Sequence, residues 1–238
     1  MRRIAALALA LLLTVFAGCG KKLPDPPAPN YTLEILEEYR KENGCSIKLL
    51  YPQISGLPDA GLEQQINFRA KEYADAAYTR CSLGVNGSEY TSLSAQVLLS
   101  TRDVFSVLVT GVFQPQGGEN TVSFAYTVNC DVTTAEFLET EDIAADYSAL
   151  KQLFLQGKFT PDFGNERDLS KDELQVLLLQ YKDEYGIFPY LYFREGKLGI
   201  LLETLPELGG YAGFTLEIVQ AAQYLHTERA AIASLCPQ

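Results

Sequence analysis

Histidine, the most common general base in nucleophilic catalysis, is scarce in this sequence. His226 is the only histidine, and Glu228 follows it two positions later. A serine or cysteine nucleophile needs an adjacent base, most often a histidine. The sequence contains no Gly-x-Ser-x-Gly motif that such a base would serve. We therefore interpret His226 as a surface or partly buried residue of a C-terminal helix, expected over residues 220–235, and we predict that the protein is not an enzyme.

Acidic residues form their densest group at Glu136, Glu139, Glu141, Asp142 and Asp146. Two acids held at a defined separation across a cleft could hydrolyse a glycosidic bond. Alternatively, Glu141, Asp142 and Asp146 could lie near a helix N-terminus, where the helix dipole favours negative charge. We favour the second interpretation and predict no catalytic residue. Because phosphate-binding-loop, dinucleotide-binding and EF-hand motifs are also absent, we expect no cofactor.

Four cysteines lie beyond the N-terminal segment, namely Cys45, Cys81, Cys130 and Cys236. In an oxidising compartment they could form two disulfides, and the sequence alone does not choose the pairing. They could also be buried thiols, or all four could stay reduced. No pair has Cys-x-x-Cys spacing, and a single histidine does not complete a typical zinc site, so we predict no bound metal.

The N-terminus indicates where the protein is located. Arg2 and Arg3 precede an unbroken apolar run over residues 4–16. This run is shorter than the roughly 20 residues that span a bilayer, but it fits the apolar core of a signal peptide. The run ends in Ala17-Gly18-Cys19, which resembles the bacterial lipobox, whose cysteine is lipidated and becomes the first residue of the mature protein. We predict a signal peptide over residues 1–18 and lipidation of Cys19; the alternative is an ordinary cleaved signal peptide with an incidental cysteine.

A proline-rich tether is expected to follow the lipid anchor, so that residues 19–30 hold the domain off the membrane. Four prolines between Leu23 and Asn30 favour a semi-rigid polyproline II spacer. Without residues 1–18 the chain loses two of its 19 positive side chains and keeps 30 negative ones, which gives a net charge of −13. Nucleic acid is excluded as a partner by this charge, because its binding depends on Lys and Arg. We expect the membrane to be a partner only through the lipid.

Alternating apolar and polar residues predict the central sheet. Val122, Phe124 and Tyr126 share one face of a segment whose other face carries Ser123 and Thr127. This period of two is typical of a half-buried strand. Residues 93–100 and 105–110 alternate in the same way, and the short connections between the segments allow only antiparallel neighbours. The pattern predicts a three-stranded antiparallel meander with one face in solvent.

The rest of the chain predicts helices packed against this sheet, which is an α+β fold. Asp59 is a candidate N-cap for a helix with an apolar stripe, and Ser170 with Glu173 forms a capping box. Gly209, Gly210, Tyr211 and Gly213 are expected in a flexible loop, which is our candidate binding loop. We expect a single domain over residues 31–238, with two lobes at about 31–140 and 141–238 as an alternative. The expected helices are 31–42, about 60–83, 147–156 and 171–185, and the further strands are 46–54, 188–193, 198–202 and 214–218.

Several segments resemble a known family of extracytoplasmic domains of unknown function. The segment Tyr51-Pro52-Gln53-Ile54-Ser55-Gly56-Leu57, followed by a helix near Leu62, resembles the opening of domains found in the anti-sigma factor RsiV and ahead of the deacetylase domain of PdaC. The strand 121–131, the hairpin 188–202 and the strand after Gly209 are also similar. Pro115-Gln116-Gly117-Gly118 stands where the family often has a Gly-Ala-His turn.

The resemblance implies a binding or sensing module, and the RsiV domain recognises lysozyme. We therefore predict a surface lipoprotein whose domain binds a cationic protein or a cell-wall fragment without turning it over. The alternative is a carboxylate-dependent cell-wall or glycan hydrolase.

Overall fold

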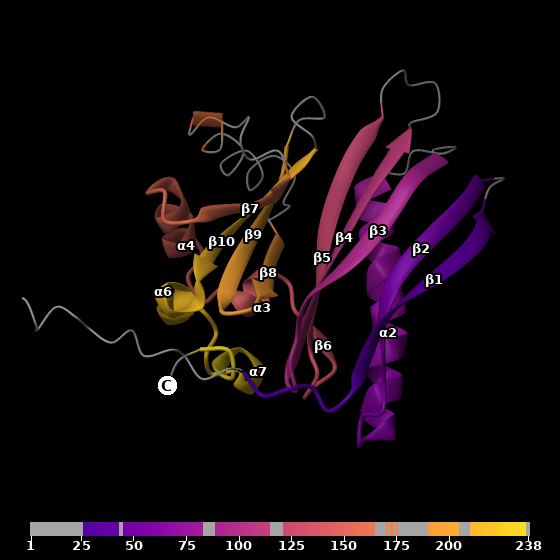
Figure 1. Ribbon diagram of the computed structural model, residues 1–238, viewed down its shortest axis with the longest axis horizontal. Helices are drawn as coiled ribbons and strands as arrows, with labels where there is room; N and C mark the ends of the chain where they lie inside the picture. Colours follow the sequence, from indigo (N-terminus) through magenta and orange to yellow (C-terminus); the bar gives the residue numbers. More distant parts are fainter. Residues whose placement is uncertain are drawn as a thin grey trace, which may run out of the picture.

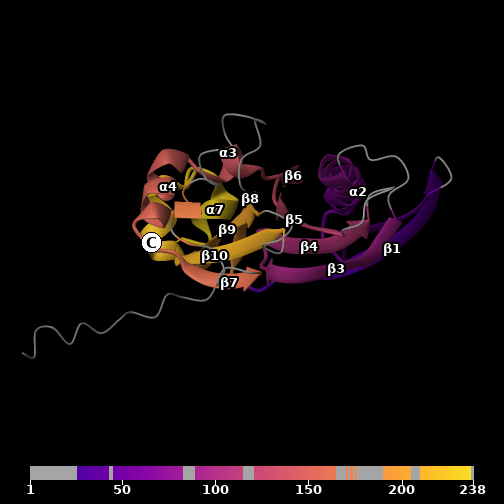
Figure 2. The ribbon, with the colours of Figure 1, turned by 90° about the horizontal axis from the view of Figure 1, so that it is seen from above.

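The computed structural model describes residues 26–42, 45–82, 89–114, 121–164, 170, 172–173, 175, 190–204 and 210–236. Its architecture is α+β: antiparallel strands form an elongated, curved layer. The helices α2 (Ala60–Ser82), α3 (Thr140–Ile143) and α4 (Tyr147–Leu155) lie on one side of it (Figures 1 and 2). The predicted fold class is confirmed. No helix within these described ranges is both long and apolar enough to cross a membrane.

The predicted meander is present and forms the first sheet. Its strands β3 (Glu89–Ser100), β4 (Val104–Gln114), β5 (Val122–Asp131) and β6 (Glu136–Phe137) are antiparallel and neighbour one another in chain order. Phe105 lies opposite Cys130 and Val107 opposite Val128, so that the apolar residues of β4 and β5 share a buried face. Local alternation of side chains was sufficient to predict the antiparallel order of β3, β4 and β5.

A separate hairpin precedes the meander. β1 (Thr32–Glu42) pairs with β2 (Cys45–Ser55) along its whole length. The strand predicted at 46–54 is confirmed, whereas the helix predicted at 31–42 is wrong. The spacing of Leu33 and Leu36 suits a helix, but Leu33 and Ile35 suit a strand equally well. The continuous partner strand β2 decides between them, because pairing overrides a weak local preference.

The helix α2 (Ala60–Ser82) begins where its cap was predicted. Asp59 Oδ1 accepts hydrogen bonds from the backbone N–H groups of Gly61 and Leu62, at 2.9 and 3.0 Å. These bonds satisfy donors that the first helical turn leaves without intrahelical partners. Ile66 lies fully buried on the apolar stripe and packs against the meander core.

The second half of the chain builds another antiparallel sheet, in the order β7-β10-β9-β8. Gly196, with φ of 68°, forms the turn of the predicted hairpin between β8 and β9. Short helices cover this sheet and complete a second hydrophobic core. The elements are α3 (Thr140–Ile143), α4 (Tyr147–Leu155), β7 (Thr160–Gly164), β8 (Tyr190–Arg194), β9 (Lys197–Glu203), β10 (Tyr211–Glu217), α6 (Ile218–Ala221), η3 (Ala222–Tyr224) and α7 (Ala230–Ala233).

Two expectations for the second half need correction. The expected loop at 209–213 is largely strand, because β10 already begins at Tyr211 and pairs there with Glu203. The expected helix over 220–235 is broken: α6 ends at Ala221, the 3-10 helix η3 that follows it ends at Tyr224, and α7 begins only at Ala230. The capping box is confirmed, since Ser170 N–H donates to Glu173 Oε2 and Glu173 N–H donates to Ser170 Oγ, at 2.7 and 3.2 Å.

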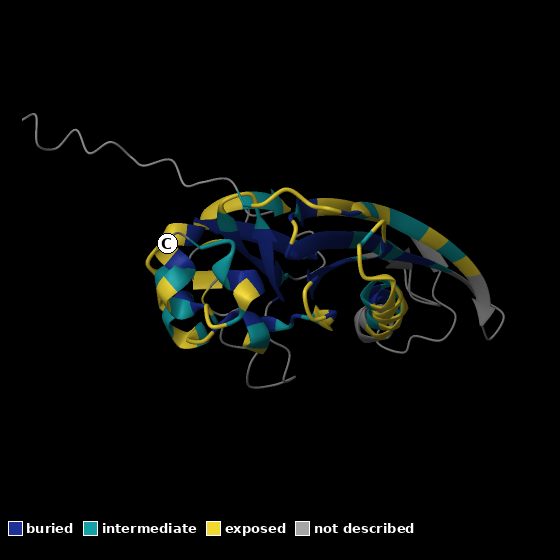
Figure 3. Cartoon of the chain, turned by 90° about the horizontal axis from the view of Figure 1, so that it is seen from below, coloured by how far each residue is buried: buried dark blue, intermediate teal, exposed yellow. Residues whose placement is uncertain are grey.

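The meander was expected to expose its polar face to solvent, but part of that face is buried. Thr127 and Asn129 are buried where β8 crosses β5, and Figure 3 shows the buried residues gathered where the two sheets meet. Thr127 Oγ1 and Asn129 Nδ2 both donate to the backbone carbonyl of Leu191, at 3.0 and 2.8 Å. Ser106 Oγ donates to Asn129 Oδ1 at 2.7 Å and accepts from Phe193 N–H at 3.2 Å. We call these residues the sheet-crossing network; its hydrogen bonds allow polar side chains to be buried.

Candidate functional site

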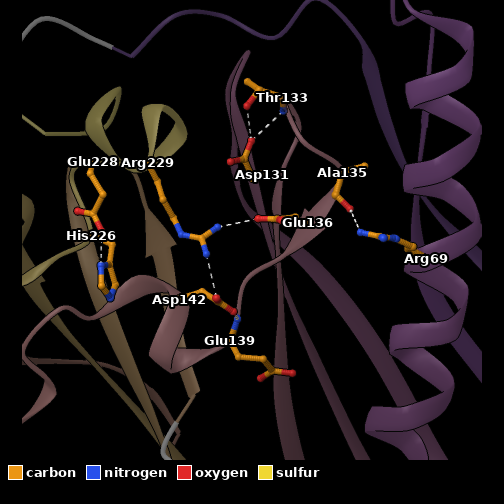
Figure 4. A network of polar contacts seen from close by, with 10 residues as sticks. All are labelled: Arg69, Asp131, Thr133, Ala135, Glu136, Glu139, Asp142, His226, Glu228 and Arg229. Atoms are coloured by element: carbon orange, nitrogen blue, oxygen red, sulfur yellow. Dashed lines mark hydrogen bonds and ion pairs between the residues drawn. The ribbon is translucent and has the colours of Figure 1, made fainter.

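The predicted acidic residues meet a distant arginine between the two halves of the chain. Figure 4 shows Arg229, which directly precedes α7, pointing toward Glu136 of β6 and Asp142 of α3. Arg229 Nη1 lies 2.7 Å from Glu136 Oε2, and Nη2 lies 3.0 Å from Asp142 Oδ1. We call these three residues, with Glu139, the acidic junction. One guanidinium therefore binds two carboxylates and ties the C-terminal segment to β6 and α3.

Other acidic residues of this group organise helix N-termini. Glu139 N–H donates to Asp142 Oδ2 at 3.1 Å, which is one half of a capping box for α3. Asp146 caps α4 by accepting from Ala149 N–H at 2.9 Å. Glu141 lies in the first turn of α3 and is exposed. The interpretation of these acids as helix-terminal residues is confirmed.

His226 is also close to this region but lies outside any helix. Its backbone N–H donates to the carbonyl of Ile143 at 3.0 Å, and its Nδ1 lies 2.5 Å from Glu228 Oε1. The pKa of the exposed Glu228 carboxyl is lowered by its own backbone N–H and then by the hydrogen bond with His226. The imidazole is thus bound to a carboxylate two residues away and is partly exposed, whereas its expected position within a helix is wrong.

Hydrogen bonds from within the turn and from α2 hold the turn between β5 and β6. Asp131 Oδ1 accepts from Thr133 N–H and Oγ1, at 2.8 and 2.6 Å. Ala135 is fully buried with φ of 58°, a left-handed conformation uncommon for residues other than glycine. Its carbonyl accepts from Arg69 Nη1 of α2 at 2.9 Å (Figure 4). Neither Arg69 nor Arg229 could be recognised from local sequence, because each binds partners at remote positions in the chain.

A second polar group lies between β7 and β8. Tyr192 donates its hydroxyl to Asp162 Oδ2 at 2.9 Å, and Arg194 Nη1 lies 2.6 Å from Asp162 Oδ1. Burial and then the Asp162 charge raise the pKa of Tyr192 well above its usual range. A Cβ at Gly199 would clash with the Tyr192 ring, so the ring is enclosed. We interpret this group as structural, since arginine compensates the carboxylate and the hydroxyl is buried.

The candidate binding loop is placed in the second sheet as far as it is described. Gly210 is buried with φ of 82°, and its backbone lies so close to Ser123 O that no side chain would fit. Gly213 lies beneath the ring of Phe163, and the half-buried Tyr211 ring lies 6.4 Å from that ring. Gly209 lies outside the described residues. A role of these residues in binding stays a prediction.

The cysteines that can be described are unpaired. Cys130 is a buried free thiol, and Cys236 is a half-buried one, so neither forms a disulfide in this structure. Burial, followed by the charge of Asp131, raises the pKa of the Cys130 thiol, which keeps it protonated and unreactive. Cys19 and the side chains of Cys45 and Cys81 lie outside the described residues. Within the described ranges, no three His, Cys, Asp or Glu side chains converge in a way that could hold a metal ion.

Fold and site together define an α+β domain in which two antiparallel sheets meet at the sheet-crossing network. Two solved structures share this fold: a DUF3298 family member from Bacteroides fragilis NCTC 9343 and a DUF3298 family protein from Pseudomonas aeruginosa PAO1. The first has a TM-score of 0.52 at 12% identity over 89% of this chain and 99% of that one. The second has a TM-score of 0.50 at 12% identity over 90% and 99%. No protein-family model matches the sequence, and no curated protein matches it. The shared fold is compatible with the resemblance to domains of unknown function.

Proposed function

We propose that this protein is a lipid-anchored extracytoplasmic domain that binds a partner without chemical turnover. The observation that carries the proposal is that the side chains best suited to catalysis are already bound to other groups of the protein. Arg229 binds Glu136 and Asp142, Asp146 caps a helix, and His226 contacts Glu228. Each of these groups has a structural partner in place of a substrate.

The acidic junction fits poorly with a carboxylate-pair hydrolase. Such an enzyme needs one acid to protonate the leaving group and another to attack or to activate water, with the scissile bond between them. Here the guanidinium of Arg229 lies between the carboxylates of Glu136 and Asp142 (Figure 4). A substrate would have to displace an arginine that joins two remote segments.

Charge supports a cationic partner. The chain without its first 18 residues carries a net charge of −13, from 17 positive and 30 negative side chains. An acidic surface attracts a basic protein over distances comparable to the Debye length, about 10 Å at 0.1 M salt and about 3 Å at 1 M. We expect association with a cationic protein such as lysozyme to be faster and tighter at low salt.

Titration of the mature protein tests the proposal. Calorimetry with lysozyme and, separately, with soluble muropeptides measures binding, and the same preparations are assayed for glycan and peptide cleavage. We expect binding of lysozyme that weakens with salt, and no turnover. Turnover lost in Asp142→Asn or Glu139→Gln, but kept in the matched surface variant Glu195→Gln, would overturn the binding function in favour of the hydrolase.

Cell fractionation tests the anchor. We expect wild-type protein in the membrane fraction and Cys19→Ala protein released from it, because the substitution removes the thiol that carries the lipid. Equal membrane retention of both proteins would contradict lipidation.

A further inference from the structure

The last part of the tether is bound to the folded domain. Arg102 N–H donates to the carbonyl of Pro27 at 2.9 Å, and the Tyr31 hydroxyl donates to the carbonyl of Thr101 at 2.7 Å. Tyr31 is buried, so the second bond is shielded from water. Both bonds reach the turn between β3 and β4, and in Figure 1 the segment entering β1 runs below that end of the meander. The chain therefore leaves the domain at a fixed place.

Chain length then limits how far this place can lie from the lipid. Position 27 is eight residues from position 19. A fully extended chain of that length spans at most about 29 Å, and a polyproline II chain about 25 Å. Lys21 and Lys22 lie next to Cys19, and each basic residue near an anionic membrane surface contributes on the order of 1 kcal/mol of attraction.

The other end of the meander lies much further from the anchor. β3 has 12 residues, and a strand of that length extends about 40 Å at roughly 3.3 Å per residue. Tyr39, an exposed side chain in β1, is eight positions along from Tyr31, on the way to the far tip of the hairpin. The tether holds only the β3–β4 turn within this distance of the lipid, and a bilayer with anionic lipids repels the rest of a domain whose net charge is −13.

We propose that the end of the domain formed by the β3–β4 and β5–β6 turns faces the lipid bilayer, and that the opposite end points away from it toward partners. This orientation depends on the lipid anchor of the proposed function. Charge at the near end is compatible with a bilayer surface. Asp103 is paired there with Arg102, at 2.8 Å, Glu136 shares Arg229 with Asp142, and Asp131 is buried and bonded to Thr133, while Thr134 is exposed and uncharged.

Energy transfer from single tryptophans to the membrane tests this orientation, since the natural chain contains no Trp. Thr134→Trp places a donor at the near end, and Tyr39→Trp places one toward the far end. Each lipidated full-length protein is inserted into phosphatidylcholine–phosphatidylglycerol vesicles that contain dansyl-phosphatidylethanolamine as acceptor. We expect several-fold more transfer from Trp at position 134 than from Trp at position 39. Equal transfer, or the reverse order, would overturn the proposal.

Lengthening the tether identifies the cause of the orientation. An insertion of about 20 Gly and Ser residues between Asp25 and Pro26 adds on the order of 25 Å of reach. We expect the difference in transfer between the two tryptophans to shrink. A difference that persists undiminished would show that the short tether does not orient the domain.

A further arm separates failure of the anchor from failure of the orientation. Hexahistidine replaces residues 1–19, and the protein is bound to vesicles that contain nickel-chelating lipid. Absence of native protein from the vesicles would contradict lipidation at Cys19 and hence the proposed anchor. The nickel-bound protein must still show the predicted difference in transfer, because its attachment point is unchanged; without that difference the orientation itself is wrong.

Discussion

Replacing Asn129 by Ala is expected to destabilise the joint between the two sheets. The substitution removes two buried hydrogen bonds, from Asn129 Nδ2 to Leu191 O at 2.8 Å and from Ser106 Oγ to Asn129 Oδ1 at 2.7 Å. Thr127 still donates to Leu191 O, so that carbonyl stays satisfied. The Ser106 hydroxyl, in contrast, loses its acceptor in a buried position. Two lost bonds and one unsatisfied donor predict a loss of about 2–4 kcal/mol in the free energy of unfolding.

A matched variant keeps the shape of the side chain and removes fewer hydrogen bonds than Asn129→Ala does. Thr127→Val deletes one hydroxyl that shares its acceptor with Asn129, so we expect a loss of only about 0.5–1.5 kcal/mol. Ser106→Ala combined with Asn129→Ala should cost less than the sum of the single changes, by about 1 kcal/mol, because both remove the same bond.

Urea denaturation of the mature chain, followed by circular dichroism, measures these changes. With slopes of about 1–3 kcal/mol/M, the Asn129→Ala midpoint should shift on the order of 1 M. A free energy of unfolding for Asn129→Ala within about 0.5 kcal/mol of the wild-type value would refute the reasoning, because substitutions of solvent-exposed residues have effects of that size. It would mean that water, and not β8, satisfies this face of β5.

Three further changes test other parts of the fold by the same assay. Gly199→Ala should cost about 1–3 kcal/mol because its methyl group would overlap the enclosed ring of Tyr192; an unchanged midpoint would show that the ring can move aside. Asp59→Ala should cost about 1 kcal/mol by removing the cap of α2, and Asp59→Asn should restore most of it. Burial raises the pKa of Tyr31 to about 12, so the unfolded chain ionises first and stability should fall as pH rises from about 10 through 12. Tyr31→Phe should lower stability near neutral pH but reduce that alkaline slope; an unchanged slope would contradict burial of this hydroxyl.

Local chemistry predicted the elements whose signals lie within one segment. The alternation in β5 and the Asp59 cap each need only a few neighbouring residues, and both are present as expected. Asp146 likewise caps the helix that follows it directly. These features depend on the geometry of one strand or one helical turn, which the sequence determines locally.

Features that depend on remote partners were missed. The segment 32–42 is a strand because β2 pairs along its whole length, and the Glu136 and Asp142 carboxylates bind an arginine about 90 positions away. Thr127 and Asn129 have the polarity of a solvated face, yet β8 covers them and supplies the carbonyl that they need. A buried polar residue with a distant acceptor has the same sequence pattern as an exposed one.

The strand order of the second sheet has a consequence for the timing of folding during synthesis. In the meander each strand pairs with the next one along the chain, so pairing can begin as soon as a short turn has emerged from the ribosome. β7 differs, because its strand partner among the described residues is β10, which ends at Glu217. The nascent chain must therefore keep Thr160–Gly164 unpaired until the residues up to Glu217 have been made. Premature termination before Tyr211 would leave an open strand edge, the kind of surface on which unfinished chains aggregate.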